Sequence, residues 1–523
     1  MRNAPAGTLG VAKPRRVAQP RPPLLPTRRS DAVRTRSAAP QEPVPAEGPS
    51  WDGAKLQPAA IAIGAGLIVR FLVPVPDGLT VQSWQTLAIF VSTVFGLVLE
   101  PLPVGAWAFC GLTAAVITNS LTFQAAFAAF TNEVIWLIVC SFFFAKGFEK
   151  TGLGERVANL FVKIAGKSTL GLAYGLAIAD AIISPAMPST SARAGGIFMP
   201  IVKSLSNTAN SLPNDPSRNK VGAFLTQSLL QASNHSSALF LTAAAQNLLC
   251  LNLAASFGAV IPGPWLAWLI ASCVPAITGI LITPWLVYKL QPPEIKDTPE
   301  APVEAGERLK ALGPMSGQEK IMLGVMGLAV VLWVAGEGLG VAPVVAAMLG
   351  LCLLLFTGVL KWKECLEYTP AWDTLVWFAV LIGMSAQLNS MGVIKHFADA
   401  MGASLSSLGL SWQALTVLLN AAYFFLHYLF ASQTAHVGAL YAAFLAMMIA
   451  AGCPPVLGGL LLAFTTNLFG SITHFASGQA AVYFGAGYLK LDEVFKVGGI
   501  LGVVSLVVWT VLGGLWWKVI GLY

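Results

Sequence analysis

Two short polar clusters in a strongly apolar chain have the residue types needed to bind an anion. They lie 243 positions apart and read Ser189-Thr190-Ser191-Ala192-Arg193 and Ser432-Gln433-Thr434-Ala435-His436. Hydroxyl groups donate hydrogen bonds to carboxylates, while arginine and protonated histidine contribute positive charge. The pattern therefore favours recognition of a negatively charged solute.

The first cluster lies in a stretch that cannot form one continuous helix. Residues 181–200 read AIISPAMPSTSARAGGIFMP, in which Pro185 and Pro188 interrupt any helix. The backbone groups that they free are tolerated at membrane depth only where the chain is buried in protein or lines a polar cavity. A cation such as Arg193 at that depth indicates a functional site. We therefore predict the tip of a hairpin inside a membrane.

The composition excludes an ordinary soluble domain. The 523 residues are 56% hydrophobic and 11% charged, with a mean hydropathy of +0.70. Apolar stretches of about 18 to 22 residues match the thickness of a bilayer. The net charge of +7 comes from the first 40 residues, which hold nine Lys and Arg against one acid, so no basic surface for nucleic acid remains elsewhere. The sequence predicts a polytopic membrane protein.

The N-terminal segment, residues 1–48, has the composition of an organelle transit peptide. It is rich in Arg, Ser, Ala and Pro and lacks the apolar core of a secretory signal. The alternative is a disordered basic tail that stays on the mature protein. The seven cysteines are scattered, so the sequence predicts neither a disulfide framework nor a metal site, and no cofactor.

The order of apolar runs predicts an all-α fold of about eleven transmembrane helices and two re-entrant hairpins. A first helix falls within residues 49–81. The remaining parts are a first repeat at 82–290 with a hairpin at 168–204, a charged, Pro-rich and solvated linker at 291–318, and a second repeat at 319–523 with a hairpin at 411–451.

Local similarities support two repeats. NEVIW at 132–136 parallels DTLVW at 373–377, and Thr151-Gly152-Leu153 parallels Met391-Gly392-Val393. Each repeat would cross the membrane an odd number of times, which inverts the second copy relative to the first, as in many transporters. With the N-terminus inside, eighteen Lys and Arg residues fall inside and three outside, which agrees with the positive-inside rule.

Each predicted hairpin precedes a span with a polar interruption, TAAAQNLL at 242–249 and SITHFASGQAAVYFGAG at 471–487. We expect four irregular segments to converge, because broken helices direct their N-terminal N–H groups at anions.

The same residues also have structural interpretations. A lone Ser or Thr in a membrane helix often only packs or bonds back to its own chain. Arg193 alone could pair with Asp180, and His436 alone could be a core histidine, as we expect for His427 and His474. Because the cluster occurs twice, each time before a broken span, we favour a binding site.

At these motifs the chain resembles the divalent anion/sodium symporter family, and within it the plastid dicarboxylate translocators, from about residue 57 to its end. The family carries Ser-Asn-Thr at each hairpin tip and a Thr-Pro-Pro-Asn-like break after each hairpin. Here Thr190 and Gln433 replace the asparagines, and the breaks read Ala244-Ala245-Gln246-Asn247 and Ala476-Ser477-Gly478-Gln479, without the prolines. The resemblance implies a homodimer that moves its substrate domain like an elevator. The predicted substrate-binding residues are Ser189, Thr190, Ser191, Arg193, Asn247, Ser432, Gln433, Thr434, His436, Ser477 and Gln479.

The resemblance implies exchange of 2-oxoglutarate and malate across the plastid inner envelope. Sodium-coupled symport and glutamate/malate exchange stay as alternatives, although no acidic residue stands out as a partner for an amino group. An intramembrane enzyme is disfavoured, because no G-x-S-x-G or H-E-x-x-H pattern accompanies Ser189 or His436. We further hypothesise that Arg193 and His436 replace the sodium ions, so that a fixed charge makes exchange obligatory and independent of sodium.

Overall fold

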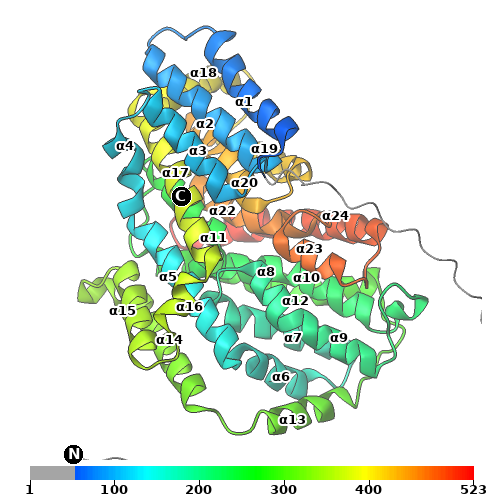
Figure 1. Ribbon diagram of the computed structural model, residues 1–523. Coiled ribbons are helices and arrows are strands. Elements are labelled where there is room, and N and C mark those ends of the chain that lie inside the picture. Colours follow the sequence, from blue (N-terminus) through cyan, green and yellow to red (C-terminus); the bar gives the residue numbers. More distant parts are fainter. Residues whose placement is uncertain (1–52) are drawn as a thin grey trace, which may run out of the picture. The chain divides into compact units, whose positions relative to one another are not determined.

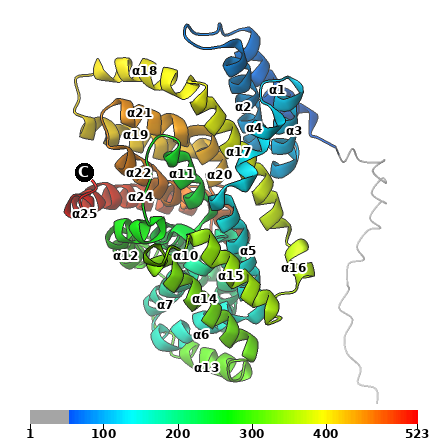
Figure 2. The same ribbon diagram turned by 90° about the vertical axis from the view of Figure 1, so that its left-hand side faces the viewer.

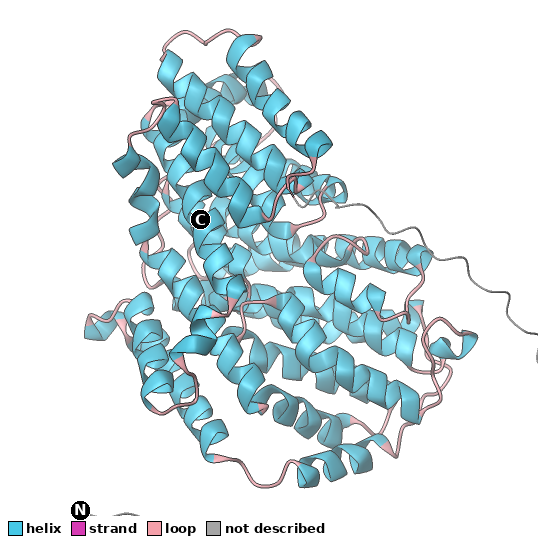
Figure 3. Ribbon diagram, viewed as in Figure 1, coloured by secondary structure: helices cyan, strands magenta, loops and turns pink. Residues whose placement is uncertain are grey.

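A computed structural model describes residues 53–523, which form helices joined by loops (Figures 1 and 3). No strand occurs among these residues, although Ser168 and Asp297 form an isolated bridge. The prediction of an all-α membrane protein is confirmed. The predicted transit segment lies outside the described residues.

Within residues 53–523, seven helices are long and apolar enough to cross a membrane, or eight if one bent pair counts as a span. The bent pair joins the helical stretch Phe123–Thr131 to α5 (Glu133–Thr151) at 50°. Four more apolar helices are shorter than these, including α1 (Leu56–Phe71), α3 (Val104–Ile117) and α15 (Pro343–Phe356). The total of about eleven spans therefore stays a prediction.

The first three helices pack side by side at one end of the described chain (Figures 1 and 2). Between α1 and α3 lies α2 (Val81–Leu99), which begins with a capping box in which Thr80 and Ser83 satisfy each other's backbone N–H groups. Both α2 and α3 contact α17 (Thr369–Ser390), which also packs on α5. These contacts join the N-terminal helices to α17 in the second predicted repeat.

The two segments predicted to form hairpins share the same internal structure. The first consists of α7 (Thr169–Ile183), α8 (Thr190–Arg193), a π turn at Ala194–Phe198 and α9 (Met199–Thr208). The second consists of α19 (Trp412–Leu426), α20 (Gln433–His436), a π turn at Val437–Tyr441 and α21 (Ala442–Ala450). The 3-10 turns that end α7 and α19, at Ser184–Ala186 and His427–Leu429, are also 243 residues apart. This correspondence supports the predicted repeat.

The two broken spans lie where the sequence predicts them. The chain leaves α10 (Gly222–Leu239) at an extended Phe240 and resumes helix as α11 (Ala245–Ala255). In the second half α22 (Pro455–Leu468) is followed, after irregular backbone, by α23 (Gly478–Gly485). Two long helices, α12 (Pro264–Leu290) and α24 (Leu491–Val507), follow the broken spans.

The linker is more ordered than its composition indicates. It contains α13 (Ala301–Ala311), whose Ala301 and Ala305 are buried, and this helix packs on α6 (Leu153–Ala165). Before α13, the Thr169 N–H donates to the Lys296 carbonyl at 2.9 Å. The prediction of a solvated linker is wrong in this respect, because small alanines on one face let a charged helix lie against its neighbour. After the linker come α14 (Gly317–Ala335), α16 (Trp362–Leu366) and α18 (Val393–Ser406).

Candidate functional site

A serine begins the helix at each hairpin tip. Ser189 and Ser432 have extended backbones and accept hydrogen bonds from the N–H groups of Ala192 and Ala435 at 3.2 and 3.4 Å. Serine is a preferred N-cap because its hydroxyl replaces the missing helical acceptor. Each tip therefore presents the positive end of a helix together with short hydroxyl side chains.

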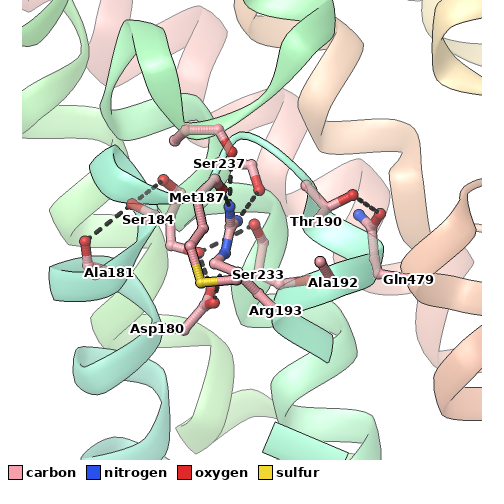
Figure 4. A network of polar contacts seen from close by, with 12 residues as sticks. Asp180, Ala181, Ser184, Met187, Thr190, Ala192, Arg193, Ser233, Ser237 and Gln479 are labelled. Atoms are coloured by element: carbon pink, nitrogen blue, oxygen red, sulfur yellow. Dashed lines mark hydrogen bonds and ion pairs between the residues drawn. The ribbon is translucent and has the colours of Figure 1, made fainter. Parts of the chain in front are cut away.

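The first tip contacts the break of the second repeat. Thr190, the first residue of α8, donates its hydroxyl hydrogen to Gln479 Oε1 at 2.5 Å (Figure 4). Ser191 lies against Gly478, where an added Cβ would stand 2.0 Å from the Ser191 Oγ. Glycine at the start of α23 thus permits the first tip to approach its N-terminus.

The second tip contacts the break of the first repeat in the reciprocal way. Gln246 Nε2 donates to Gln433 Oε1 at 3.3 Å and to Asn467 Oδ1 at 3.2 Å. Gln433 is the first residue of α20, as Thr190 is of α8. Gln246 and Gln479 are each the second residue of the helix that follows a break.

Two further links close these contacts into a ring of four helix N-termini. The Ala245 N–H, at the start of α11, donates to the carbonyl of Pro188 at 3.2 Å. The cap of α23, Ser477, donates to the carbonyl of Gly470 at 2.5 Å. An added Cβ at Gly470 would stand 2.6 Å from Gln433 Nε2. The N-termini of α8, α23, α20 and α11 therefore meet, and the expected convergence of four irregular segments is present.

Burial divides the predicted binding residues into two groups. The hydroxyl residues of the tips, Ser189, Thr190, Ser191, Ser432 and Thr434, are partly exposed. The other group, which consists of Gln433, Gln479, Asn247, Ser477, Arg193 and His436, is buried. The partly exposed hydroxyls can be reached by a solute, although that of Thr190 also bonds to Gln479, whereas the buried side chains hold the segments in place.

Arg193 belongs to the frame of the site. Its side chain is 1% exposed, and Nε donates to Asp180 Oδ1 at 2.9 Å. Nη1 donates to the carbonyls of Met187 and Ala243 at 2.5 and 2.6 Å, and Nη2 to Ser237 Oγ at 2.8 Å. Figure 4 shows the guanidinium turned toward Asp180 and Ser237, away from the contact between Thr190 and Gln479. The hypothesis that Arg193 supplies an unpaired positive charge is wrong, because Asp180 neutralises it. The alternative, that Arg193 pairs with Asp180, is confirmed.

His436 occupies the matched position in the second hairpin, with aromatic partners. Its Nδ1 lies 3.2 Å from His427 Nδ1, and its ring meets the Tyr423 ring edge-on at 4.4 Å between centroids. A hydrogen bond between two Nδ1 atoms requires that one of them carries no proton. Tyr423 stands 243 residues after Asp180, so the second hairpin replaces a buried ion pair with an aromatic cluster.

The sequence analysis did not include Gln246 among the binding residues, and it aligned the two breaks one residue out of register. Ala244 and Ser477 are the N-caps of α11 and α23, so Gln246 corresponds to Gln479. The signal that could have revealed this pair is a glutamine two residues after each cap. Asn247 instead braces its own break, donating to the Ser237 carbonyl at 2.8 Å and accepting from Asn467 at 2.6 Å.

The donors and acceptors at the junction of the tips are hydroxyl and amide groups. Between residues 53 and 523 no group of three or more His, Cys, Asp or Glu side chains could hold a metal ion. Hydroxyl and amide groups suit hydrogen bonding to carboxylates.

Comparisons with known proteins agree on one class. Residues 54–523 match the model of the family described as the sodium:sulfate symporter transmembrane region. The chain is 60% identical to the chloroplastic dicarboxylate transporter 2 of Spinacia oleracea, over 91% of this chain and 84% of that protein. It is 46% identical to the chloroplastic dicarboxylate transporter 1 of Arabidopsis thaliana, over 94% and 88%. The solved structure of the YdaH transporter of Alcanivorax borkumensis shares the fold, with a TM-score of 0.55 at 14% identity over 89% of this chain and 98% of that one.

Proposed function

Since the chain belongs to the sodium:sulfate symporter family, we propose that it exchanges dicarboxylates across the inner envelope membrane of plastids. The resemblance noted in the sequence is confirmed at the level of the family, and the chain is a transporter and not an enzyme. It is a multi-pass chloroplast membrane protein. The substrate, the mode of coupling and the homodimeric state are parts of the proposal.

The ring of four helix N-termini is the observation that carries this function. Each helix N-terminus has a partial charge of about +0.5, so four together supply about +2 against the two negative charges of a dicarboxylate. The partly exposed hydroxyls of Ser191 and Thr434 add hydrogen bonds at matched positions of the two tips. Charge compensation by the helices leaves no requirement for sodium at the site.

The same arrangement supports exchange over one-way uptake. When the substrate leaves, the helix ends face each other without a counter-charge in a medium of low polarity, which is unfavourable. The empty carrier should therefore cross slowly and the loaded carrier quickly. The uncompensated charge of the helix ends, and not a fixed charge on Arg193, makes exchange obligatory in this proposal.

The preferred pair of substrates is 2-oxoglutarate and malate. Asp180, the acidic side chain closest in sequence to the first tip, is committed to Arg193 and Ser236, so it offers no partner to an amino group. Glutamate with malate is the second candidate, because the hydroxyls of Ser432 and Thr434 can also accept hydrogen bonds from an ammonium group. Inhibition of labelled malate uptake by each dicarboxylate distinguishes the two pairs.

Counterflow in proteoliposomes tests the proposal. Purified protein should take up labelled malate only into vesicles preloaded with a dicarboxylate, at equal rates in sodium and potassium media. Uptake into empty vesicles driven by a sodium gradient would establish symport in its place. Absence of dicarboxylate uptake under both conditions would reject the proposed substrate class.

A further inference from the structure

A cavity of about 540 Å³ lies between α1, α2 and α3, apart from the candidate transport site. Its walls are mostly apolar and include Ile89 and Trp107. Sites for small organic ligands span about 300 to 1,000 Å³. Ile63 and Leu67 on its rim are 48% and 51% exposed, so in the bilayer the cavity is accessible from the hydrocarbon.

One end of the cavity is polar. Arg70 in the last turn of α1, Gln85 near the start of α2 and Thr118 at the end of α3 line it, and Gln85 Nε2 donates to the Thr118 carbonyl at 3.4 Å. Among residues 53–523 no acidic side chain pairs with Arg70, whose guanidinium lies 5.2 Å from the Phe71 ring centroid. An unpaired arginine beside an apolar cavity is complementary to an amphiphile with an acidic head.

We propose that this cavity binds an anionic membrane lipid, with its acidic head group at Arg70 and an acyl chain between the three helices. The lining on α2 runs from Gln85 to Thr93. Eight residues of helix measure about 12 Å, which accommodates the upper part of an acyl chain. Anionic lipids attract basic side chains at the membrane surface, and a zwitterionic lipid compensates the charge of Arg70 less well because its head group also carries a cation.

The position of α2 gives such a lipid a route to the transport site. On another face α2 contacts α20 and the π turn Val437–Tyr441 of the second hairpin. A lipid that fills the cavity packs against the face of α2 that points toward α1 and α3, and so supports the helix against which the second tip rests.

Native mass spectrometry and thermal unfolding of the full chain test this site, with phosphatidylglycerol and phosphatidylcholine as probes. The unmodified protein should retain phosphatidylglycerol and unfold at a higher temperature with it than with phosphatidylcholine. Arg70→Gln should reduce this preference about fivefold, the contribution of one basic residue near an anionic surface. Ala114→Trp should expel the lipid by filling the cavity, because Ala114 lines it. Lys518→Gln removes an exposed cation that does not line the cavity and should behave like the unmodified protein.

Three outcomes would overturn the proposal. The first is equal retention of both lipids by the unmodified protein. The second is full retention of phosphatidylglycerol by Arg70→Gln, because the head group would then not contact Arg70. The third is a disulfide between two Leu67→Cys protomers that forms in either lipid, which would assign the cavity to a second copy of the chain.

Discussion

Thr190 and Gln479 come from positions far apart in the sequence, yet their side chains share a hydrogen bond of 2.5 Å. If this bond joins the two halves of the binding site, Thr190→Val and Gln479→Leu should each weaken malate binding, and the double variant should lose less than the sum. We expect a coupling of about 1 kcal/mol. The measurement is a double-mutant cycle on malate affinity in detergent. Strict additivity would show that the bond contributes nothing to the site.

The ion pair of Arg193 and Asp180 provides a second test at this scale. Asp180→Asn should destabilise the protein by about 3 to 5 kcal/mol, because it leaves a buried positive charge without its partner. The double change Asp180→Asn with Arg193→Gln should recover part of this stability and should still bind malate, since both side chains are buried and bonded within the frame of the site. Thermal unfolding and malate binding are the two measurements. If the double variant folds but binds no malate, Arg193 contributes to substrate binding after all.

The sequence revealed individual residues where a motif recurs at a fixed offset. Both tips were found because a serine, a hydroxyl residue and a basic residue repeat 243 positions apart. The contacts of Gln246 and Gln479 could not be found in this way, because each bonds to the opposite repeat and depends on how the hairpins fold together. The neutralisation of Arg193 by Asp180 was recognised only as an alternative, since sequence spacing does not show whether a charge faces its neighbour or a cavity.

Gly478, the first residue of α23, allows a test of how closely the first tip packs on this helix. Gly478→Ala places a Cβ 2.0 Å from Ser191 Oγ, so the Ser191 hydroxyl must rotate away or the first tip must move from the second break. Overpacking of this kind costs about 1 to 3 kcal/mol, and because this cost falls on the arrangement of the tip that binds substrate, malate uptake should decrease roughly five- to hundredfold. Gly485→Ala is a matched control, because it ends the same helix and an added Cβ there has no atom within 4 Å. Equal activity of the two variants would contradict the close contact between the tip and α23.

Hairpins and breaks were predictable because Pro, Gly and polar residues interrupt apolar runs. The π turns after α8 and α20 were not, since their sequences AGGIF and VGALY contain no proline or charged residue that marks a change of helix type. Helix α13 was missed for a different reason: proline and charge suggested a solvated segment, but Ala301 and Ala305 pack on α6.

At the scale of the whole molecule, Arg156 of α6 is bonded to Glu319 of α14. Arg156 Nε lies 2.5 Å from Glu319 Oε1, and Nη1 donates to the Gly313 carbonyl at 2.9 Å. Because α6 packs on the first hairpin, an elevator motion that carries this hairpin past α14 requires this pair to break. Glu319→Gln should then raise the maximal exchange rate about fivefold at unchanged malate affinity, because the bond that must break is weaker; the Arg156 side chain is 16% exposed, and an ion pair near the surface contributes up to about 1 kcal/mol. Glutamine retains the capping box with Ser316, so α14 stays capped.

An unchanged rate for Glu319→Gln in proteoliposomes would indicate that α6 and α14 stay together during transport.

The membrane class of the molecule could be predicted from hydropathy alone. The number of spans could not, because four apolar helices are shorter than a bilayer crossing requires.

The most direct test of a single site shared by both hairpins compares Ser191→Ala with Thr434→Ala. The two residues hold matched positions and neither caps a helix, so their removal should affect binding more than folding. Thr113→Ala is the control, because Thr113 on α3 only bonds back to the Phe109 carbonyl. Malate affinity, measured by titration calorimetry in detergent, should fall roughly ten- to hundredfold in each of the two tip variants, the cost of one hydrogen bond to a charged group. Unchanged affinity in one tip variant, with the protein folded, would contradict the shared site.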